Sequence, residues 1–279
     1  MTAMGLLDLV VLTSRTLGIA LAATLRGLPE VRSVTVVTTK VVPRQSLVRK
    51  LRRMYLHEGA SGVRQALFRR LRGVSAGSPE ELAMLVRRTC PGSRHIHLDD
   101  LHTTASLSTL RDLAPDLGVV FATYRLRPEV FGIPRMGCLN LHLGRAPEYR
   151  GSSPGFYEMF DGVPEVGVTV HRVSAKLDEG PILLQETFPL ETAPTGDPLE
   201  YLRRYQAEVL IPEGIRLMSQ AVQNLAQGIS EERGQGPGSR PRPRATYRLQ
   251  QELRRRVAER RAQDGPGLSQ ELTFRLPES

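Results

Sequence analysis

The stretch LLDLVVLTSRTLGIALAATLRGLPEVRSVTVVTT (residues 6–39) contains two apolar runs on either side of a helical pattern. Residues 6–12 are almost wholly apolar, which predicts a buried strand, and residues 17–26 predict a helix. Residues 31–39 are rich in β-branched side chains and are bounded by prolines, which predicts a second buried strand. Strand, helix and strand in so short a stretch are typical of a parallel βαβ unit.

The same alternation continues along most of the chain. It predicts a mostly parallel twisted sheet with helices on both faces, in a Rossmann-like, three-layer α/β fold. Pro212 lies inside the last long helical pattern, so we expect a kink there and an end at Gly228. The predicted strands are 95–98, 116–122, 137–141, 166–173 and 182–188, and the predicted helices are 80–88, 107–113 and 198–226.

The net charge of +9 comes from two local segments. Residues 44–72 hold nine basic side chains against Glu58 alone, on two predicted helices at 46–55 and 63–71. The chain from residue 231 onward holds eleven arginines against seven acids. Such local basicity favours an anionic partner: a nucleotide-sugar diphosphate, an acidic carrier protein or RNA.

These segments also suggest a division of the chain. We expect a catalytic domain over residues 1–190, with a basic helical insertion at about 44–78. A helix packed on that domain would follow at 191–230. Residues 231–279 would form a linker rich in Arg, Pro and Gly, together with a basic surface helix at 249–262.

Several protein classes do not fit this composition. The two cysteines, Cys90 and Cys138, lie far apart without other metal ligands at a suitable spacing, so neither a disulfide framework nor a zinc site is predicted. The apolar start lacks the basic region and cleavage site of an export signal, and it is too interrupted to span a bilayer. We therefore expect a cytoplasmic protein that does not contact membranes.

Asn140, His142 and Asp178 are the residues that carry chemistry. Asn140 and His142 are two apart at the end of a predicted strand, so their side chains project to the same side. A carboxamide and an imidazole placed together can stabilise a developing oxyanion and move a proton. Asp178 lies in a turn between two strands, where a carboxylate could orient His142 or raise its pKa.

Other polar residues leave two interpretations open. His95, His97 and His102 lie near Asp99 and Asp100, which suits either a metal site or, as we favour, a solvated loop.

Arg150 and His171 are similarly open. Arg150 suits either a grip on a substrate anion or an ion pair that holds its own loop. His171 is as compatible with a satisfied core histidine as with a partner of the reacting groups.

Four motifs occur in one order: NLHLGRAP (140–147), YRG (149–151), GVTVH (167–171) and LDEGPILLQ (177–185). Together they resemble the family of formyltransferases that use 10-formyltetrahydrofolate. The resemblance is strong over residues 110–190 and weaker over residues 1–110. It implies a formyltransferase fold and a one-carbon transferase with folate as the formyl-donor cosubstrate and no metal.

The resemblance also implies roles for individual residues. Asn140 and His142 would stabilise the oxyanion that forms when an amine attacks the formyl carbon, while Asp178 would assist proton transfer. The pterin of the folate would lie along Phe121, Ala122, Thr123, Tyr124 and Leu126 and beside Lys176 and Leu177. Tyr149, Arg150 and Gly151 would contact the substrate.

The chain departs from the family pattern near the site. Leu143 follows the histidine where a proline is usual, and residues 13–18 lack the phosphate loop of the glycinamide ribonucleotide enzymes. The residues after Gly228 are too few for the C-terminal barrel usual in the tRNA enzyme. We therefore expect a small anionic acceptor, with an amino-sugar nucleotide as the leading candidate.

Three alternatives remain at this point: a formyltetrahydrofolate hydrolase, a methionyl-tRNA-type formyltransferase, or a non-catalytic relative that binds nucleic acid. The sequence leaves the oligomeric state open, with a homodimer among the options.

Overall fold

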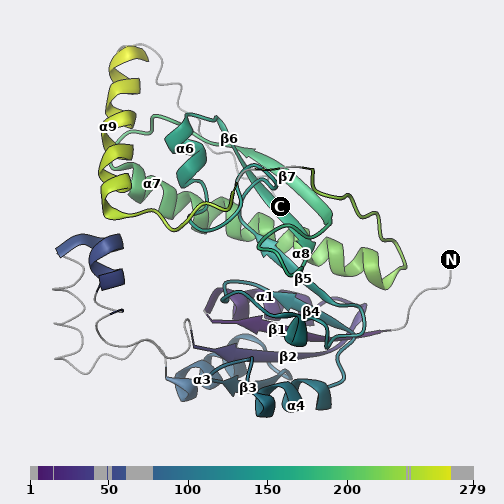
Figure 1. The fold of residues 1–279 in the computed structure, drawn as a ribbon. Helices are drawn as coiled ribbons and strands as arrows, with labels where there is room; N and C mark the ends of the chain where they lie inside the picture. The colour runs from purple at the N-terminus through teal and green to yellow at the C-terminus, as the bar shows by residue number, and fades with distance from the viewer. Residues whose placement is uncertain are drawn as a thin grey trace.

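The computed structural model describes residues 6–14, 16–40, 49, 52–60, 78–236, 238 and 240–264 (Figure 1). Its strands are β1 (Leu7–Thr13), β2 (Val31–Thr39), β3 (Arg94–Leu98), β4 (Leu117–Val120), β5 (Cys138–His142), β6 (Glu165–Arg172) and β7 (Ile182–Pro189). Its helices are α1 (Thr16–Arg26), α3 (Pro79–Thr89), α4 (Thr104–Asp112), α5 (Pro128–Phe131), α6 (Phe156–Asp161), α7 (Pro198–Tyr205), α8 (Ile211–Ala226) and α9 (Tyr247–Asp264), and residues 52–60 are also helical.

The strands form one sheet in the order β3-β2-β1-β4-β5-β6-β7. β3, β2, β1, β4 and β5 are parallel, whereas β5–β6 and β6–β7 pair antiparallel. β1 leads outward to β2 on one side, and the chain returns to β4 on the other, so the strand order reverses between β1 and β4. In open α/β sheets this reversal opens a crevice at the carboxyl ends of the strands, where ligands bind.

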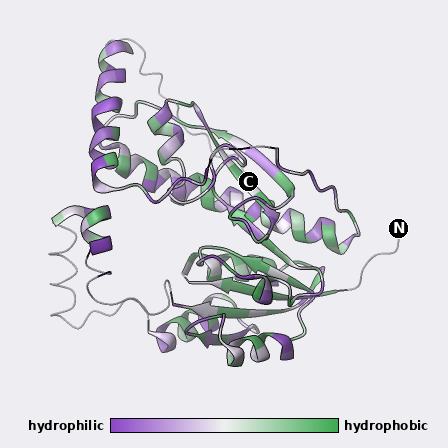
Figure 2. Cartoon of the chain, in the orientation of Figure 1, coloured by the Kyte–Doolittle hydropathy of each residue, from purple (hydrophilic) through white to green (hydrophobic). Residues whose placement is uncertain are grey.

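Alternate residues of β1 enter two separate cores. Leu9 and Val11 pack into the core that α1 and α8 cover, whereas Val10 and Leu12 pack with Leu110 of α4 on the opposite face. Helices therefore cover both faces of a mixed, mostly parallel sheet, as the sequence predicts. Figure 2 shows hydrophobic residues concentrated in the central strands of the sheet, with hydrophilic residues on the outer faces of the helices.

Local sequence signals explain several element boundaries. Ser78 caps α3 in a capping box: its hydroxyl accepts from Glu81 N at 3.2 Å, and the Glu81 carboxylate accepts from Ser78 N at 2.8 Å. The helix predicted over 198–226, with a kink at Pro212, is interrupted by a π-helical stretch, Gln206–Leu210, just before that proline. Pro212 follows directly; it lacks an N–H and its ring crowds the carbonyl four residues earlier, so the α-helical ladder cannot pass through unchanged.

The C-terminal region packs on the domain over much of its described length. Composition predicts a linker at 234–244, yet residues 233 and 242 form isolated β-bridges with residues 182 and 151. The predicted basic helix 249–262 is present as α9, and its Leu253 and Val257 are fully buried.

The predicted helical pair of the basic segment lies mostly outside the described residues, apart from residue 49 and helix 52–60. Figure 1 shows that helix beside the lower end of α9, where Gln250 donates a hydrogen bond to the carbonyl of His57 at 2.9 Å. None of the helices in the described part of the chain has the length and apolarity that a membrane crossing needs.

Candidate functional site

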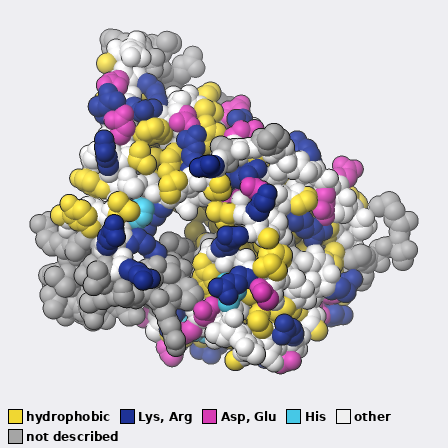
Figure 3. Space-filling model, viewed as in Figure 1, with side chains coloured by type: hydrophobic (Ala, Val, Ile, Leu, Met, Phe, Trp, Pro, Cys, Tyr) yellow, Lys and Arg dark blue, Asp and Glu magenta, His cyan; other side chains and the backbone are white. Residues whose placement is uncertain are grey.

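A cavity of about 830 Å³ lies at the carboxyl ends of β4 and β5, beside the reversal of strand order. Asn140, His142 and Asp178 all line it. Figure 3 shows a hollow in this face of the molecule, with basic side chains at its margin. The volume is in the range of pockets that hold a cofactor-sized ligand.

The three predicted reacting residues come together as the strand spacing requires. His142 Nδ1 lies 3.8 Å from Asp178 Oδ2, while His142 Nε2 donates a hydrogen bond to the carbonyl of Tyr149 at 2.7 Å. In the neutral tautomer that this bond requires, Nδ1 is unprotonated and faces the carboxylate. Asp178 is held by the Gly151 amide, which donates to Oδ2 at 2.9 Å.

His171 joins this cluster from the neighbouring strand β6. Its Nδ1 donates to the carbonyl of Arg172 at 2.8 Å, so its Nε2 accepts from the Asn140 amide at 3.1 Å. His171 Nε2 also lies 3.7 Å from Asp178 Oδ1. Of the two interpretations left open by the sequence, a buried histidine and a partner of the reacting groups, both hold at once: His171 is 2% exposed and orients Asn140.

Burial sets the protonation states of these groups. It lowers the pKa of His142, and the opposing effects of Asp178 and the Tyr149 carbonyl do not compensate. Burial also raises the pKa of Asp178, but His171, His142 and the Gly151 amide outweigh it and leave that pKa below its ordinary value. At neutral pH the site thus holds a neutral imidazole, able to take up a proton, beside a carboxylate. Asp178 does raise the pKa of His142, as expected, but burial lowers that pKa by more.

The residues predicted to border the pterin line the same cavity. They are Phe121, Ala122, Thr123, Tyr124, Leu126, Lys176 and Leu177. Phe121 and Leu126 are buried and offer apolar surface, whereas Lys176 and Leu177 lie on the exposed rim. Ala122 has a φ of +56° and Asp178 a φ of +52°. This backbone conformation is strained for residues other than glycine, and such strain is often found at ligand sites.

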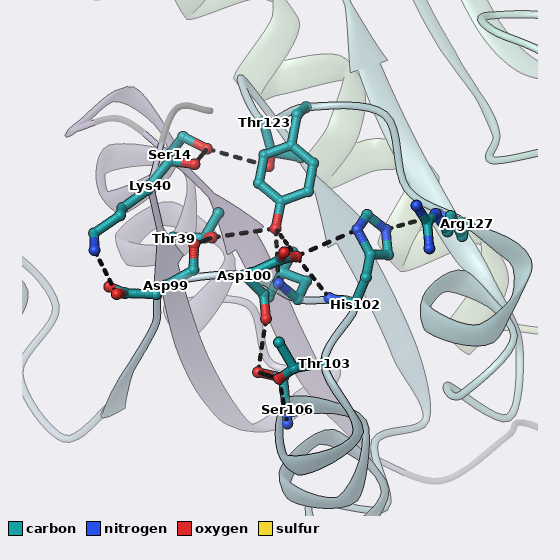
Figure 4. Close-up of polar contacts among 12 residues, drawn as sticks. Ser14, Thr39, Lys40, Asp99, Asp100, His102, Thr103, Ser106, Thr123 and Arg127 are labelled. Atoms are coloured by element: carbon teal, nitrogen blue, oxygen red, sulfur yellow. Dashed lines mark hydrogen bonds and ion pairs between the residues drawn. The ribbon is translucent and has the colours of Figure 1, made fainter. Parts of the chain in front are cut away.

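A polar network behind the cavity wall holds the segment after β4 (Figure 4). The Tyr124 hydroxyl accepts from Leu101 N at 2.7 Å and lies 3.3 Å from the Thr39 hydroxyl. His102 Nε2 accepts from Arg127 N at 3.1 Å. The network fixes the main chain from residue 123 to 127 against the end of β2.

The side chains of the histidine-rich segment make polar contacts with one another and with β2. His95 Nε2 and His97 Nδ1 both lie within 3.0 Å of the Thr38 hydroxyl, and Asp99 pairs with Lys40. Among the described residues no group of His, Cys, Asp and Glu has the arrangement of a metal site. His95 and His97 lie on β3 and are half-buried, so these two residues are not part of the solvated loop that the sequence favoured.

The YRG motif lies beside His142 but faces inward. Arg150 is 6% exposed and pairs with Glu179 at 2.8 Å, which matches the loop-holding interpretation of this residue. Tyr149 contributes its carbonyl to His142, and Gly151 its amide to Asp178. The motif supports the reacting groups through its main chain, and Gly151 also lines the cavity.

Sequence analysis did not identify the residues that line the opposite side of the cavity. They come from helix 52–60, from α7, from the segment before α9 and from α9 itself, and they include Arg53, His57, Arg203, Arg244 and Gln250. Three arginines from separate parts of the chain meet there, so this half of the cavity is basic. Their positions in the sequence carry no shared motif, and only the tertiary fold brings them together.

The fold and this site define a class of protein: an α/β fold with an Asn-His-Asp cluster at the carboxyl edge of its sheet. Comparisons with known proteins show which family the segment that carries this site is similar to. The profile described as "Formyl transferase" matches residues 80–214. This segment, which contains Asn140, His142 and Asp178, is similar to the formyl transferase family.

Curated relatives agree over part of their length. Methionyl-tRNA formyltransferase of Roseiflexus sp. (strain RS-1) is 41% identical over 115 residues, which are 40% of this chain and 35% of the relative. The enzyme of the same name from Pseudomonas fluorescens (strain SBW25) is 38% identical over 132 residues, 47% of this chain and 39% of the relative. The chain thus spans less than half the length of the curated relatives that it matches.

Solved structures agree in fold. Glycinamide ribonucleotide transformylase 1 from Symbiobacterium toebii has a TM-score of 0.53 at 23% identity, covering 82% of this chain and 93% of that one. A 4-N formyltransferase from Francisella tularensis has a TM-score of 0.54 at 13% identity, covering 85% and 76%. HypX from Aquifex aeolicus in complex with tetrahydrofolic acid has a TM-score of 0.52 at 15% identity, covering 92% and 34%.

Proposed function

We propose that this protein transfers a formyl group from 10-formyltetrahydrofolate to a primary amine. The observation that carries the proposal is the meeting of Asn140, His142 and Asp178 on one large cavity within a formyl transferase segment. The buried Phe121 and Leu126 offer apolar surface to a flat pterin ring, and the cavity is large enough for the folate donor.

Each residue then has a task that its environment supports. When bound, the folate supplies the formyl carbon. Asn140 donates a hydrogen bond to the formyl oxygen, where negative charge develops during attack; one amide hydrogen is engaged by His171, and the second remains for this task. His142, neutral because it is buried, takes a proton from the attacking amine nitrogen. Asp178 remains ionised and stabilises the imidazolium that results. The imidazolium would return this proton to the folate nitrogen as the bond between that nitrogen and the formyl carbon breaks, so that tetrahydrofolate leaves and His142 is neutral again.

The acceptor proposed here is an amine on a phosphate-bearing molecule. The basic half of the cavity, with Arg53, Arg203 and Arg244, supports an anion at that side. The curated relatives are methionyl-tRNA formyltransferases, whereas sugar N-formyltransferases are similar in structure only. This comparison favours an aminoacyl-tRNA acceptor over the amino-sugar nucleotide that the sequence suggested first.

The test supplies 10-formyltetrahydrofolate with methionyl-tRNA in one arm and a set of amino-sugar nucleotides in another. We expect release of tetrahydrofolate together with a formylated acceptor in one arm, most readily with methionyl-tRNA. Formate release in a third arm without acceptor would instead indicate hydrolysis. If no arm releases tetrahydrofolate, the proposed function is wrong.

A further inference from the structure

Residues 230–246, which we name the C-terminal strap, cross both loops that carry the reacting groups; residues 237 and 239 of the strap are not described. On one side the strap meets the turn after Asp178. Arg233 and Ile182 exchange two main-chain hydrogen bonds of 2.8 Å, and the Gln235 amide donates to the Gly180 carbonyl at 2.7 Å. These bonds extend the sheet edge and fix the start of β7.

On its other side the strap meets the loop after His142. Arg242 N donates to the Arg150 carbonyl at 2.9 Å, and Ser152 N donates to the Arg242 carbonyl at 3.2 Å. The Arg242 main chain passes so close to Gly151 that a Cβ there would lie 2.2 Å from the Arg242 carbonyl oxygen. Contact this close requires a glycine, so the YRG loop and the strap form one packed unit.

The Arg242 side chain makes a second set of contacts with the same loop. Its guanidinium lies over the rings of Tyr149 and Tyr157, at 5.1 Å and 4.9 Å from their centroids, and pairs with Asp161 at 2.8 Å. Stacking and a fixed ion pair together orient a planar guanidinium. These contacts therefore hold the Tyr149 ring in place. The carbonyl of the same residue accepts the hydrogen bond from His142 Nε2.

We propose that Arg242 is a positioning residue for His142: by clamping Tyr149 it fixes the carbonyl that orients the imidazole. This proposal rests on the proposed function for its catalytic consequence, but the positioning itself is a property of the free protein. The segment that looks like a linker in the sequence is then a part of the reaction centre.

The pKa of His142 is a measurable quantity that distinguishes this positioning role from a general loss of packing. The groups facing His142 are Asp178, His171, Arg150 and the Tyr149 carbonyl. The carbonyl and Asp178 raise the pKa of His142, whereas His171 and Arg150 lower it, beneath the larger lowering by burial. If the Tyr149 carbonyl moves away, His142 loses a hydrogen bond that raises its pKa. The pKa of His142 should then fall further.

The experiment compares three variants. Arg242→Met removes the charge and the planar fork, Arg242→Lys restores the charge, and Arg240→Met removes an exposed arginine of the same strap for which the described structure shows no side-chain contact. Histidine side-chain NMR titration reports the pKa of His142 in each folded protein, with His142→Gln to assign the signal. Thermal unfolding confirms that each variant is folded.

We expect Arg242→Met to lower the His142 pKa and to reduce kcat at least tenfold, with KM for the folate donor changed less than twofold. The acidic limb of the kcat profile should move to lower pH by the same shift. Arg242→Lys should recover part of both effects, and Arg240→Met should match the wild type. A His142 titration in folded Arg242→Met equal to that of the wild type, or equally shifted in Arg240→Met, overturns the proposal. Because the titration needs no substrate, it tests the positioning of His142 even if the protein transfers no formyl group.

Discussion

At the scale of single residues, the proposed function separates groups that would touch the substrate from groups that would act through another residue. Asn140 lines the cavity with an amide hydrogen to spare, whereas His171, which also borders the cavity but is only 2% exposed, engages its Nε2 with Asn140. The two residues are neighbours, and yet they should contribute very differently to the rate.

Substitution of these two residues measures the difference. Asn140→Ala should reduce kcat by about 10²–10³, because it deletes a hydrogen bond to the developing oxyanion. His171→Asn should reduce kcat by only about tenfold, since it weakens the orientation of Asn140 and removes no direct contact. Steady-state kinetics with saturating donor provides both values. Equal losses in the two variants would contradict the assignment of Asn140 to the oxyanion.

Glu158 is the residue whose environment is least expected from the sequence. It lies on α6, is 2% exposed, and its Oε1 has no hydrogen-bond partner among the described residues. Burial raises its pKa to about 7, against weaker lowering by Arg242 and Arg145. Nothing in the sequence around Glu158 distinguishes it from an exposed helix glutamate.

This buried acid predicts a particular pH dependence of stability. The folded pKa lies above the unfolded value, so the folded protein is favoured at low pH and loses stability as the pH rises from about 4.5 through about 7. The loss integrates to at most ~3 kcal/mol. Glu158→Gln should abolish this loss. The free energy of unfolding of the variant, measured in urea, should therefore rise relative to that of the wild type between pH 4 and pH 8. The exposed Glu231→Gln provides the control, and a constant difference between Glu158→Gln and wild type across this range would refute the prediction.

At the scale of elements, sequence patterns predicted what local chemistry determines. β2 has the predicted bounds, Val31–Thr39, because its β-branched run ends at clear breakers. The spacing of Asn140 and His142 likewise predicted their common side of β5. The strap could not be predicted in this way: its Arg, Pro and Gly composition is that of a linker, and its order comes from main-chain bonds to residues 150, 152 and 182, distant in sequence.

The contact between the strap and the YRG loop depends on Gly151. Gly151 has a φ of +103°, and an added Cβ would meet the Arg242 main chain at 2.2 Å. Gly151→Ala should therefore destabilise the protein by about 2–4 kcal/mol, from backbone strain together with displacement of the strap. Gly137→Ala is the matched control, because Gly137 also has a positive φ, +69°, but an added Cβ there meets nothing within 4 Å.

Chemical denaturation of the two glycine variants separates the effects. Gly137→Ala should cost only the strain, about 1 kcal/mol. The difference between the variants is the cost of separating loop and strap. If Gly151→Ala proves no more destabilising than Gly137→Ala, the close packing of strap and loop is wrong.

At the scale of the whole molecule, the C-terminal region closes one side of the structure. α9 packs on α6 and α7, and Arg260 donates to the carbonyls of Met159 at 2.7 Å and Phe160 at 2.9 Å, at the end of α6. Cations at a helix C-terminus compensate its dipole and its unpaired carbonyls. The arginines of this region, which in the sequence suggested a partner, serve in part to fix α9 to its own domain.

This arrangement makes α9 a part of the cooperative unit. Leu253 is fully buried in the main core, although the hydrophilic character of α9 in Figure 2 suggests a surface helix. Leu253→Ala should cost about 2–5 kcal/mol, since it leaves a cavity in a packed core, whereas Met84→Ala on the exposed side of α3 should change stability by less than about 0.5 kcal/mol. If α9 folds with the domain, urea unfolding of Leu253→Ala will show one transition with a lower midpoint and an unchanged slope. A separate early transition, with the remaining domain as stable as the wild type, would instead mean that α9 docks as an independent element, and that the strap before it is held from one end only.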